Sequence, residues 1–276
     1  MPSFTTSDGV GLHYTDEGEG DSIVFVAGWA MDGSWWRHQQ GLSSRYRTVV
    51  LDPRSQGESE KVVRGIRMGR AAQDLRELLE LLDLDDVTLV AWSRSSSMAL
   101  AYWELFGAMR VGRFVLVGNT PSMSKRPDWE WGYIMDPVAF QDLILADHEA
   151  VVRDVIDRLL KKPPPPEEAE AMVRATMRTP ALAGARMLDD HGIIDWRDML
   201  DTISIPTLVC VGRYDRQAPV EAAEYVAAAV PGAVLVVFEE SAHAPFYEEP
   251  ELFNETLVRF IEERPAAPGD DGMSPC

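Results

Sequence analysis

Short apolar runs alternate along this chain with longer segments whose apolar residues recur at helical spacing. One amphipathic helix is predicted from the spacing of Met68, Leu75, Leu78, Leu79 and Leu82. Further helices are expected over 98–106 and 219–230 and from near Pro250. The apolar runs predict strands at 22–27, 47–51, 87–92, 113–117, 206–212 and 233–238. Strands that alternate with helices predict an α/β fold with a mostly parallel central sheet flanked by helices.

One long segment in the middle of the chain interrupts this alternation. It is helical in pattern, contains Trp129 and Trp131, and is divided by four consecutive prolines at 163–166. We expect a helical lid over the ligand-binding edge of the sheet, with the prolines as a stiff joint between its helices. A purely structural insertion is the alternative. The predicted organisation is a core at 1–118 and 201–264 that forms one domain, a helical lid at 119–200 and a disordered tail at 265–276.

A serine stands between a predicted strand and a predicted helix. The apolar run at 87–92 ends abruptly at Ser93, and the residues after it lead into the helix at 98–106. A strand, one serine and a helix form the layout of a nucleophile elbow, in which a strained turn holds the hydroxyl clear of the backbone. Ala91 and Ser95 are the small residues that such a turn needs on either side. The alternative is a serine that only caps the helix through its side-chain oxygen.

A nucleophilic serine needs a general base and a carboxylate that orients this base. Asp215 follows the predicted strand at 206–212, and His243 follows the strand at 233–238. Because the carboxyl ends of parallel strands meet at one edge of a sheet, both side chains are expected near Ser93. Asp195, before Trp196, is interpreted as a helix cap. The remaining histidines are interpreted as structural or surface residues: His13, His38, His148 and His191.

The composition favours an enzyme with a single large core and argues against several other classes of protein. Hydrophobic residues make up 46% of the 276 residues, which is enough for one such core. No apolar stretch approaches the ~20 residues of a membrane helix, and the first residues lack the pattern of a signal peptide. A cytoplasmic location is therefore expected. The formal charge of −19 argues against a nucleic-acid partner, because phosphate binding needs clustered Lys and Arg.

Nothing in the residue spacing indicates a metal or a cofactor. The chain has no C-x-x-C or H-E-x-x-H spacing of metal ligands. It also lacks a glycine-rich phosphate cradle, since the glycines at 18–21 are interpreted as a hairpin-like turn. Cys210 lies in a predicted buried strand and Cys276 is the last residue, so a disulfide framework is not expected.

With these features the chain resembles the α/β-hydrolase fold family of serine hydrolases over roughly residues 1–264. Residues 27–29 are similar to the loop after the third strand of that family, 51–59 to its D-x-R-G-x-G-x-S turn, and 241–246 to its histidine loop. Details such as Trp92 before the serine are similar to the pimeloyl-ACP methyl ester esterase subgroup. Non-haem haloperoxidase-like and enol-lactonase members share most of them. The departures from the usual pattern are Ala27 in place of His and Ser55, Ala91 and Ser95 in place of Gly.

The resemblance implies a serine hydrolase that cleaves a small, hydrophobic carboxylic ester or lactone. Ser93 would attack the carbonyl carbon and form an acyl-enzyme, with His243 as general base and Asp215 as the acid that orients it. Backbone N–H groups of Trp29 and Arg94 would form the oxyanion hole. The substrate pocket is expected to be aromatic, with lining residues Trp29, Trp92, Trp129, Trp131, Phe140 and Phe246.

Other functions are compatible with the same residues. A perhydrolase, a C–C-cleaving enzyme or another non-hydrolytic member of the fold would keep the triad, and a ligand-binding protein on the hydrolase scaffold is a further alternative. The side chain of Arg94 could pair with a substrate carboxylate or point away toward the lid. Acyl carrier protein is itself acidic, and both the lid and the rest of this chain are net acidic. We therefore expect a free small-molecule substrate and no acyl carrier protein as partner.

Overall fold

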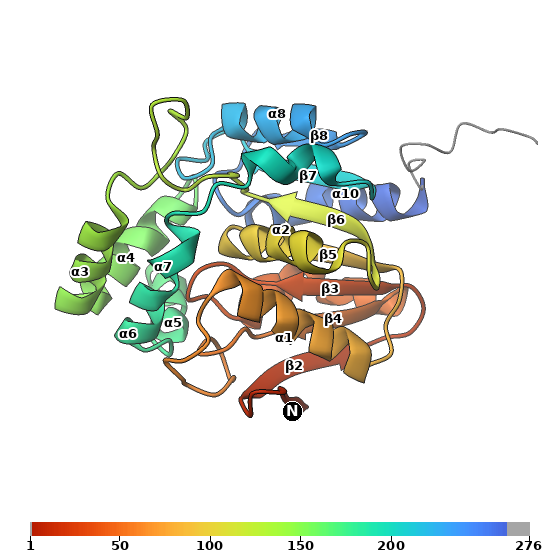
Figure 1. The fold of residues 1–276 in the computed structure, drawn as a ribbon, viewed down its shortest axis with the longest axis horizontal. Helices are drawn as coiled ribbons and strands as arrows, with labels where there is room; N and C mark the ends of the chain where they lie inside the picture. Colours follow the sequence, from red (N-terminus) through yellow and green to blue (C-terminus); the bar gives the residue numbers. More distant parts are fainter. Residues whose placement is uncertain (1, 264–276) are drawn as a thin grey trace, which may run out of the picture.

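The computed structural model describes residues 2–263, and within them the chain forms a sheet of eight strands (Figure 1). Their spatial order is β1-β2-β4-β3-β5-β6-β7-β8. The pairs β1–β2 and β2–β4 are antiparallel, and every other neighbouring pair is parallel. The strands are β1 (Ser3–Thr5), β2 (Gly11–Glu17), β3 (Ser22–Val26), β4 (Arg47–Leu51), β5 (Val87–Trp92), β6 (Val111–Val117), β7 (Thr207–Gly212) and β8 (Val234–Phe238). The predicted α/β fold with a mostly parallel sheet is confirmed.

Helices cover both faces of the parallel strands. Along β5, Leu89 and Ala91 pack into the core on one face, whereas Val90 and Trp92 pack into the core on the other. The first face is covered by α1 (Met68–Leu81), α2 (Arg94–Phe106) and α8 (Val220–Ala229), and the second by η1 (Gly33–Ser44), α9 (Pro245–Glu248) and α10 (Pro250–Glu262). Every residue of β5 and β7 is buried. Two-sided burial explains why these strands are continuous apolar runs rather than alternating sequences.

The predicted amphipathic helix is α1, which ends one residue before Leu82. It buries Met68, Leu75, Leu78 and Leu79 against the sheet, and Leu82 is partly buried just beyond its end. Among residues 2–263, no helix combines the length and the apolar character that a bilayer crossing requires.

The hairpin-like turn predicted at 18–21 is wrong. These residues do connect β2 to β3, but the two strands do not pair, because β4 lies between them in the sheet. Glycines with a positive φ, such as Gly18 and Gly20, suit any tight reversal of the chain. Their presence therefore predicts a turn but not the pairing of the strands on either side.

Between β6 and β7 the chain forms a group of short helices, and all but the last of them lie together at the left of Figure 1. They are α3 (Pro137–Ala146), α4 (His148–Leu159), α5 (Pro166–Thr176), α6 (Ala181–Arg186), α7 (Leu188–His191) and η2 (Arg197–Thr202). Three of the four prolines lie between α4 and α5, and the fourth, Pro166, is the first residue of α5. Near the end of the segment, Trp196 and Leu200 pack into the core beside the sheet. The tail predicted to be disordered, 265–276, lies outside the described residues.

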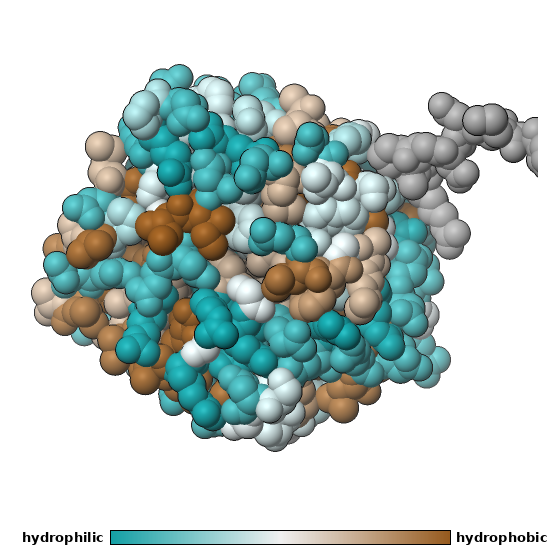
Figure 2. Space-filling model, in the orientation of Figure 1, coloured by the Kyte–Doolittle hydropathy of each residue, from teal (hydrophilic) through white to brown (hydrophobic). Residues whose placement is uncertain are grey.

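Apolar patches interrupt the hydrophilic surface of this group of helices (left part of Figure 2). Helix α3 buries only Ile144. The large hydrophobic residues that these helices and the adjoining segments expose are Met135, Val138, Leu143, Leu145, Leu182 and Ile193. A helix with so little buried surface is held weakly to the rest of the fold.

Candidate active site

Ser93 occupies a strained turn between β5 and α2. Its backbone has φ +56° and ψ −121°, a left-handed conformation that costs a non-glycine residue roughly 1–3 kcal/mol. The turn is fixed by the Ser93 N–H, which donates to the carbonyl oxygen of Val117 in β6 at 2.8 Å. The Ser93 hydroxyl makes no capping hydrogen bond to α2. The Ser93 side chain therefore does not cap the helix, and its hydroxyl is available for another partner.

The backbone passes close to Ser93, as the small neighbouring residues predict. A Cβ at Gly28 would lie 3.1 Å from the Cβ of Ser93, so a larger residue there would displace the elbow. The hydroxyl of Ser95 donates to the carbonyl oxygen of Ala27 at 2.5 Å, and that of Ser96 donates to Ala91 at 2.8 Å. These two serines thus bind the helix to neighbouring strands and loops, and their hydroxyls do not reach the site.

The structure brings Ser93, His243 and Asp215 into one hydrogen-bonded chain. Oγ of Ser93 lies 2.9 Å from Nε2 of His243, and Nδ1 of His243 lies 2.8 Å from Oδ2 of Asp215. A carboxylate only accepts, so Nδ1 carries the proton and Nε2 is left to accept the serine hydroxyl. The second oxygen of Asp215 accepts the backbone N–H groups of Gln217 and Ala218, which hold the carboxylate in place.

The loop that carries His243 is held from three directions. Its backbone N–H donates to the carbonyl oxygen of Leu159, the last residue of α4, at 2.9 Å. Its carbonyl oxygen accepts the indole N–H of Trp92 at 2.8 Å. The preceding N–H, that of Ala242, donates to the carboxylate of Glu248. The position of the imidazole therefore depends on the sheet, on α9 and on the helices between β6 and β7.

Two backbone N–H groups beside Ser93 have no acceptor among the described residues. They belong to Trp29, in the loop after β3, and to Arg94, the first residue of α2. The first N–H groups of a helix have no partner within the helix, which explains the free N–H of Arg94. The indole of Trp29 donates to the carbonyl oxygen of Gly184 in α6 at 2.9 Å, so the loop after β3 is fixed to the insertion.

A small cavity of about 40 Å³ opens at Ser93. Its floor comes from the sheet and the loop after β3, and its roof comes from the segment between β6 and β7. The residues that line it are Gly28, Trp29, Met31, Trp92, Ser93, Met123, Tyr133, Phe140, Val155, Leu159, Leu188, His191 and Gln217. The cavity is narrow compared with the several hundred Å³ of typical ligand pockets, and its walls are mainly apolar and aromatic.

Three of the six residues expected in the pocket line this cavity, namely Trp29, Trp92 and Phe140. The expectation for the other three is corrected by the structure. Trp129 and Trp131 pack edge to face with each other, at a centroid distance of 4.9 Å, and cluster with Tyr225 of α8. Phe246 lies beneath the site, in contact with Trp36 and Trp92. Their aromatic rings therefore stabilise the fold around the cavity but do not line it.

His191 was not expected at the site, yet it lines the cavity from α7. It is only 4% exposed, and Nδ1 has no hydrogen-bond partner among the described residues. Burial, together with the charge of Arg94, lowers the pKa of His191 to about 3, so the imidazole is neutral at physiological pH. Helix α7 has four residues, too few to show any periodicity, so no pattern in the sequence marked this histidine.

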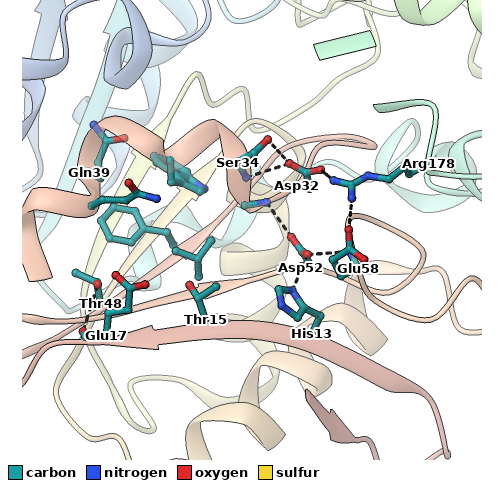
Figure 3. A pocket seen from close by; sticks show the side chains of 15 residues that line it. His13, Thr15, Glu17, Asp32, Ser34, Gln39, Thr48, Asp52, Glu58 and Arg178 are labelled. Atoms are coloured by element: carbon teal, nitrogen blue, oxygen red, sulfur yellow. Dashed lines mark hydrogen bonds and ion pairs between the residues drawn. The ribbon is translucent and has the colours of Figure 1, made fainter. Parts of the chain in front are cut away.

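A second cavity, of about 230 Å³, lies apart from the triad between β2, β4 and η1 (Figure 3). Asp52 is the centre of its polar side. One carboxylate oxygen accepts the N–H of Gly33 at 2.8 Å, and the other accepts Nδ1 of His13 and the N–H of Glu58, both at 2.9 Å. A single buried carboxylate thus joins the second strand, the start of η1 and the turn after β4.

Arg178, between α5 and α6, reaches the rim of this second cavity and pairs with Asp32 and Glu58 (Figure 3). Asp32 is only 3% exposed and lies in the loop after β3. We expect Arg178→Ala to lower the free energy of unfolding by about 1 kcal/mol, because it leaves that carboxylate without its cation. Arg174→Ala, at an exposed position of α5, is the matched control. Urea unfolding of both variants tests this, and equal effects would show that the ion pair contributes nothing specific.

Comparison with known proteins agrees with the fold. A family model described as alpha/beta hydrolase fold matches residues 21–250. A non-heme chloroperoxidase from Kitasatospora aureofaciens is 31% identical over 275 residues, covering 95% of this chain and 100% of that protein. A pimeloyl-[acyl-carrier protein] methyl ester esterase from Vibrio cholerae is 28% identical over 262 residues, covering 90% and 97%. The structure of an esterase from Exiguobacterium antarcticum matches with a TM-score of 0.90 and 26% identity, covering 94% and 98%. The chain therefore belongs to the α/β-hydrolase fold family and is an enzyme of that family.

Proposed function

We propose that the protein hydrolyses a small, hydrophobic carboxylic ester or lactone, with Ser93, His243 and Asp215 as its catalytic triad. The observation that carries this proposal is the chain of hydrogen bonds from Ser93 Oγ to His243 to Asp215, at 2.9 and 2.8 Å. Such a chain supplies a nucleophile, a base within reach of its proton, and an acid that orients the base.

The reaction follows from these positions. His243 Nε2 takes the hydroxyl proton of Ser93 while Oγ attacks the carbonyl carbon of the substrate. The imidazolium then gives its proton to the leaving alkoxide oxygen, and the C–O bond of the ester breaks. Water, activated by the same imidazole, attacks the acyl-enzyme and releases the acid. Asp215 keeps the proton on Nδ1 and stabilises the imidazolium in both steps.

The oxyanion that develops on the substrate needs donors that are already in position. The free N–H groups of Trp29 and Arg94 are those donors in this proposal. Each flanks Ser93 in space, one from the loop after β3 and one from the N-terminus of α2, where the helix dipole also favours negative charge. Removal of one such donor in other serine hydrolases costs roughly 10²–10³ in rate.

We further propose that residues 119–200 act as a lid. They supply the roof of the cavity through Tyr133, Phe140, Leu188 and other side chains. A cavity of about 40 Å³ admits a substrate only if part of the roof moves. Helix α3, which carries Phe140 and buries only Ile144, is the part of the roof expected to move.

Peroxide-dependent halogenation is a second candidate function, because the relative from Kitasatospora aureofaciens is a non-heme chloroperoxidase. The same triad would serve both reactions. Labelling with a fluorophosphonate, followed by identification of the labelled serine, tests whether Ser93 is a nucleophile at all. Turnover of p-nitrophenyl esters, compared with halogenation in the presence of peroxide and bromide, then separates the two activities.

We also propose a free ester, not a carrier-bound acyl chain, as the substrate, although the Vibrio cholerae relative is named for a carrier-linked one. In the insertion each of the two adjacent basic pairs, Lys125–Arg126 and Lys161–Lys162, has one member that is engaged with an acid. Lys161 pairs with Glu240 at 2.6 Å, and Arg126 pairs with Asp195 at 3.4 Å. An acidic carrier would therefore meet a net acidic surface, which slows encounter.

The kinetic comparison uses one methyl ester, either free or attached to acyl carrier protein. We expect kcat/KM for the carrier-bound ester to be no more than about 3-fold higher than for the free ester, with little dependence on salt. A large preference for the carrier-bound form that declines as salt is added would contradict the proposal and identify the carrier as a partner.

A further inference from the structure

Arg94 is a buried cation without an ionic partner. Its side chain is only 4% exposed, and it forms no ion pair with any carboxylate among residues 2–263. Its one hydrogen bond is long, from Nε to the carbonyl oxygen of Met187 at 3.4 Å. Burial lowers the pKa of the Arg94 guanidinium to about 10, which leaves it charged at neutral pH. An uncompensated charge in the interior destabilises a fold, so its presence beside the nucleophile calls for a compensating anion.

The nearest candidate for that anion within the chain is otherwise engaged. Asp190 is the carboxylate whose charge acts on Arg94. One of its oxygens accepts the N–H of Met68 at 2.5 Å, and the other accepts the N–H of His191 at 2.8 Å. Asp190 thus caps α1 and holds α7, and it does not reach the guanidinium.

The unpaired guanidinium lies next to the wall of the cavity. Its hydrogen-bond partner Met187 precedes Leu188, and both Leu188 and His191 line the cavity that contains Ser93. The charge of Arg94 is close enough to His191 to lower the pKa of its imidazole. His191 contributes a buried Nδ1 with no partner among the described residues. An unpaired cation behind the wall of this mainly apolar cavity therefore lies close to an unpaired imidazole that lines it.

We propose that Arg94 and His191 form a binding site for a carboxylate carried by the acyl half of the substrate. The preferred substrate would then be a short monoester of a dicarboxylic acid, or a lactone that carries an acid group. Arginine is suited to this task, because its planar guanidinium binds both oxygens of a carboxylate and stays charged where a lysine would lose its proton. His191 can add a hydrogen bond or take a proton once the anion is present. This inference rests on the proposed ester hydrolysis and adds the chemical class of the substrate.

Binding to the Ser93→Ala variant tests the proposal without any need for turnover. The ligands are the monomethyl esters of succinic, glutaric and adipic acid, each compared with its half-amide methyl ester, which has nearly the same shape and no charge. Calorimetric titration is expected to show at least about 10-fold tighter binding of the carboxylate at one of the three lengths. Introducing Arg94→Met into the same protein should bring the ratio close to 1, while Arg94→Lys should keep part of it.

Two further measurements keep the test decisive. Thermal unfolding of Arg94→Met shows whether the variant folds; loss of an unpaired buried charge is expected to leave it at least as stable as its parent. Should it not fold, His191→Leu provides the second variant, and a reduced charge preference is again expected. Equal binding of carboxylate and half-amide at all three lengths, or a preference that survives Arg94→Met, would overturn the proposal.

The proposed hydrolysis is tested separately, in the wild-type protein. Hydrolysis of the half-amide esters, together with fluorophosphonate labelling of Ser93, supports the triad whether or not charge is recognised. Failure of both, with charge-dependent binding intact, would leave a carboxylate site in a protein that is not an esterase.

Discussion

Ser93→Ala is expected to lower kcat/KM for any ester that the protein hydrolyses by about 10³-fold or more, because the members of a triad act as a unit. The hydroxyl that the substitution removes makes no structural hydrogen bond to α2, and its one hydrogen-bond partner among the described residues is the imidazole of His243. We therefore expect the variant to fold normally and to unfold at the same denaturant concentration or a higher one. Initial rates on p-nitrophenyl esters and urea unfolding measure the two effects.

Ser95→Ala is the control for this prediction, since Ser95 lies two residues away and its hydroxyl binds the carbonyl oxygen of Ala27. It should lose about 1 kcal/mol of stability and keep activity within about 10-fold of the wild type. If Ser95→Ala abolished hydrolysis and Ser93→Ala did not, the nucleophile has been assigned to the wrong serine. A fluorophosphonate that labels a residue other than Ser93 would lead to the same conclusion.

The sheet could be predicted from the sequence because its physical cause is local. Strands such as β5 and β7 are buried on both faces and therefore are continuous apolar runs, which stand out between polar loops. Strand pairing is not local. The glycines at 18 and 20 indicate a reversal of the chain, but they do not show that β4 inserts between the two strands that they join.

The candidate triad could also be predicted, because each member stands within a few residues of the carboxyl end of a strand. The carboxyl ends of parallel strands meet at one edge of the sheet, so the sequence predicts that Ser93, Asp215 and His243 lie close together. The structure adds the distances of 2.9 and 2.8 Å between them.

The cavity could not be predicted in the same way, because most of its roof comes from short helices whose packing is not encoded locally. Their aromatic character suggested that Trp129 and Trp131 line the cavity, but their rings pack against Tyr225 of α8. Conversely, Tyr133 and His191 line the cavity, although no periodic pattern in the sequence predicts that they do. The absence of an ionic partner for Arg94 could not be predicted from the sequence either. It depends on which groups the two carboxylate oxygens of Asp190 bind, and only the folded structure shows this.

Asp215→Asn is expected to lower kcat by about 10⁴-fold, although the side chain keeps its shape. An amide nitrogen facing Nδ1 of His243 would donate a hydrogen bond and favour the tautomer with the proton on Nε2. That nitrogen could then no longer accept the proton of Ser93. Folding should be preserved, because the remaining amide oxygen can still accept the N–H groups of Gln217 and Ala218.

His243→Ala should produce a loss of similar size, about 10³-fold or more, because it removes the base itself. Asp195→Asn is the matched control, since Asp195 is the other carboxylate that the sequence offered near the end of the insertion. Its oxygens bind Arg197 and not the imidazole, so activity should change by less than about 3-fold. Rates of ester hydrolysis for the three variants test whether Asp215 and His243 take part in catalysis. Full activity in Asp215→Asn or His243→Ala would show that the hydrogen-bonded chain seen in the structure is not the catalytic one.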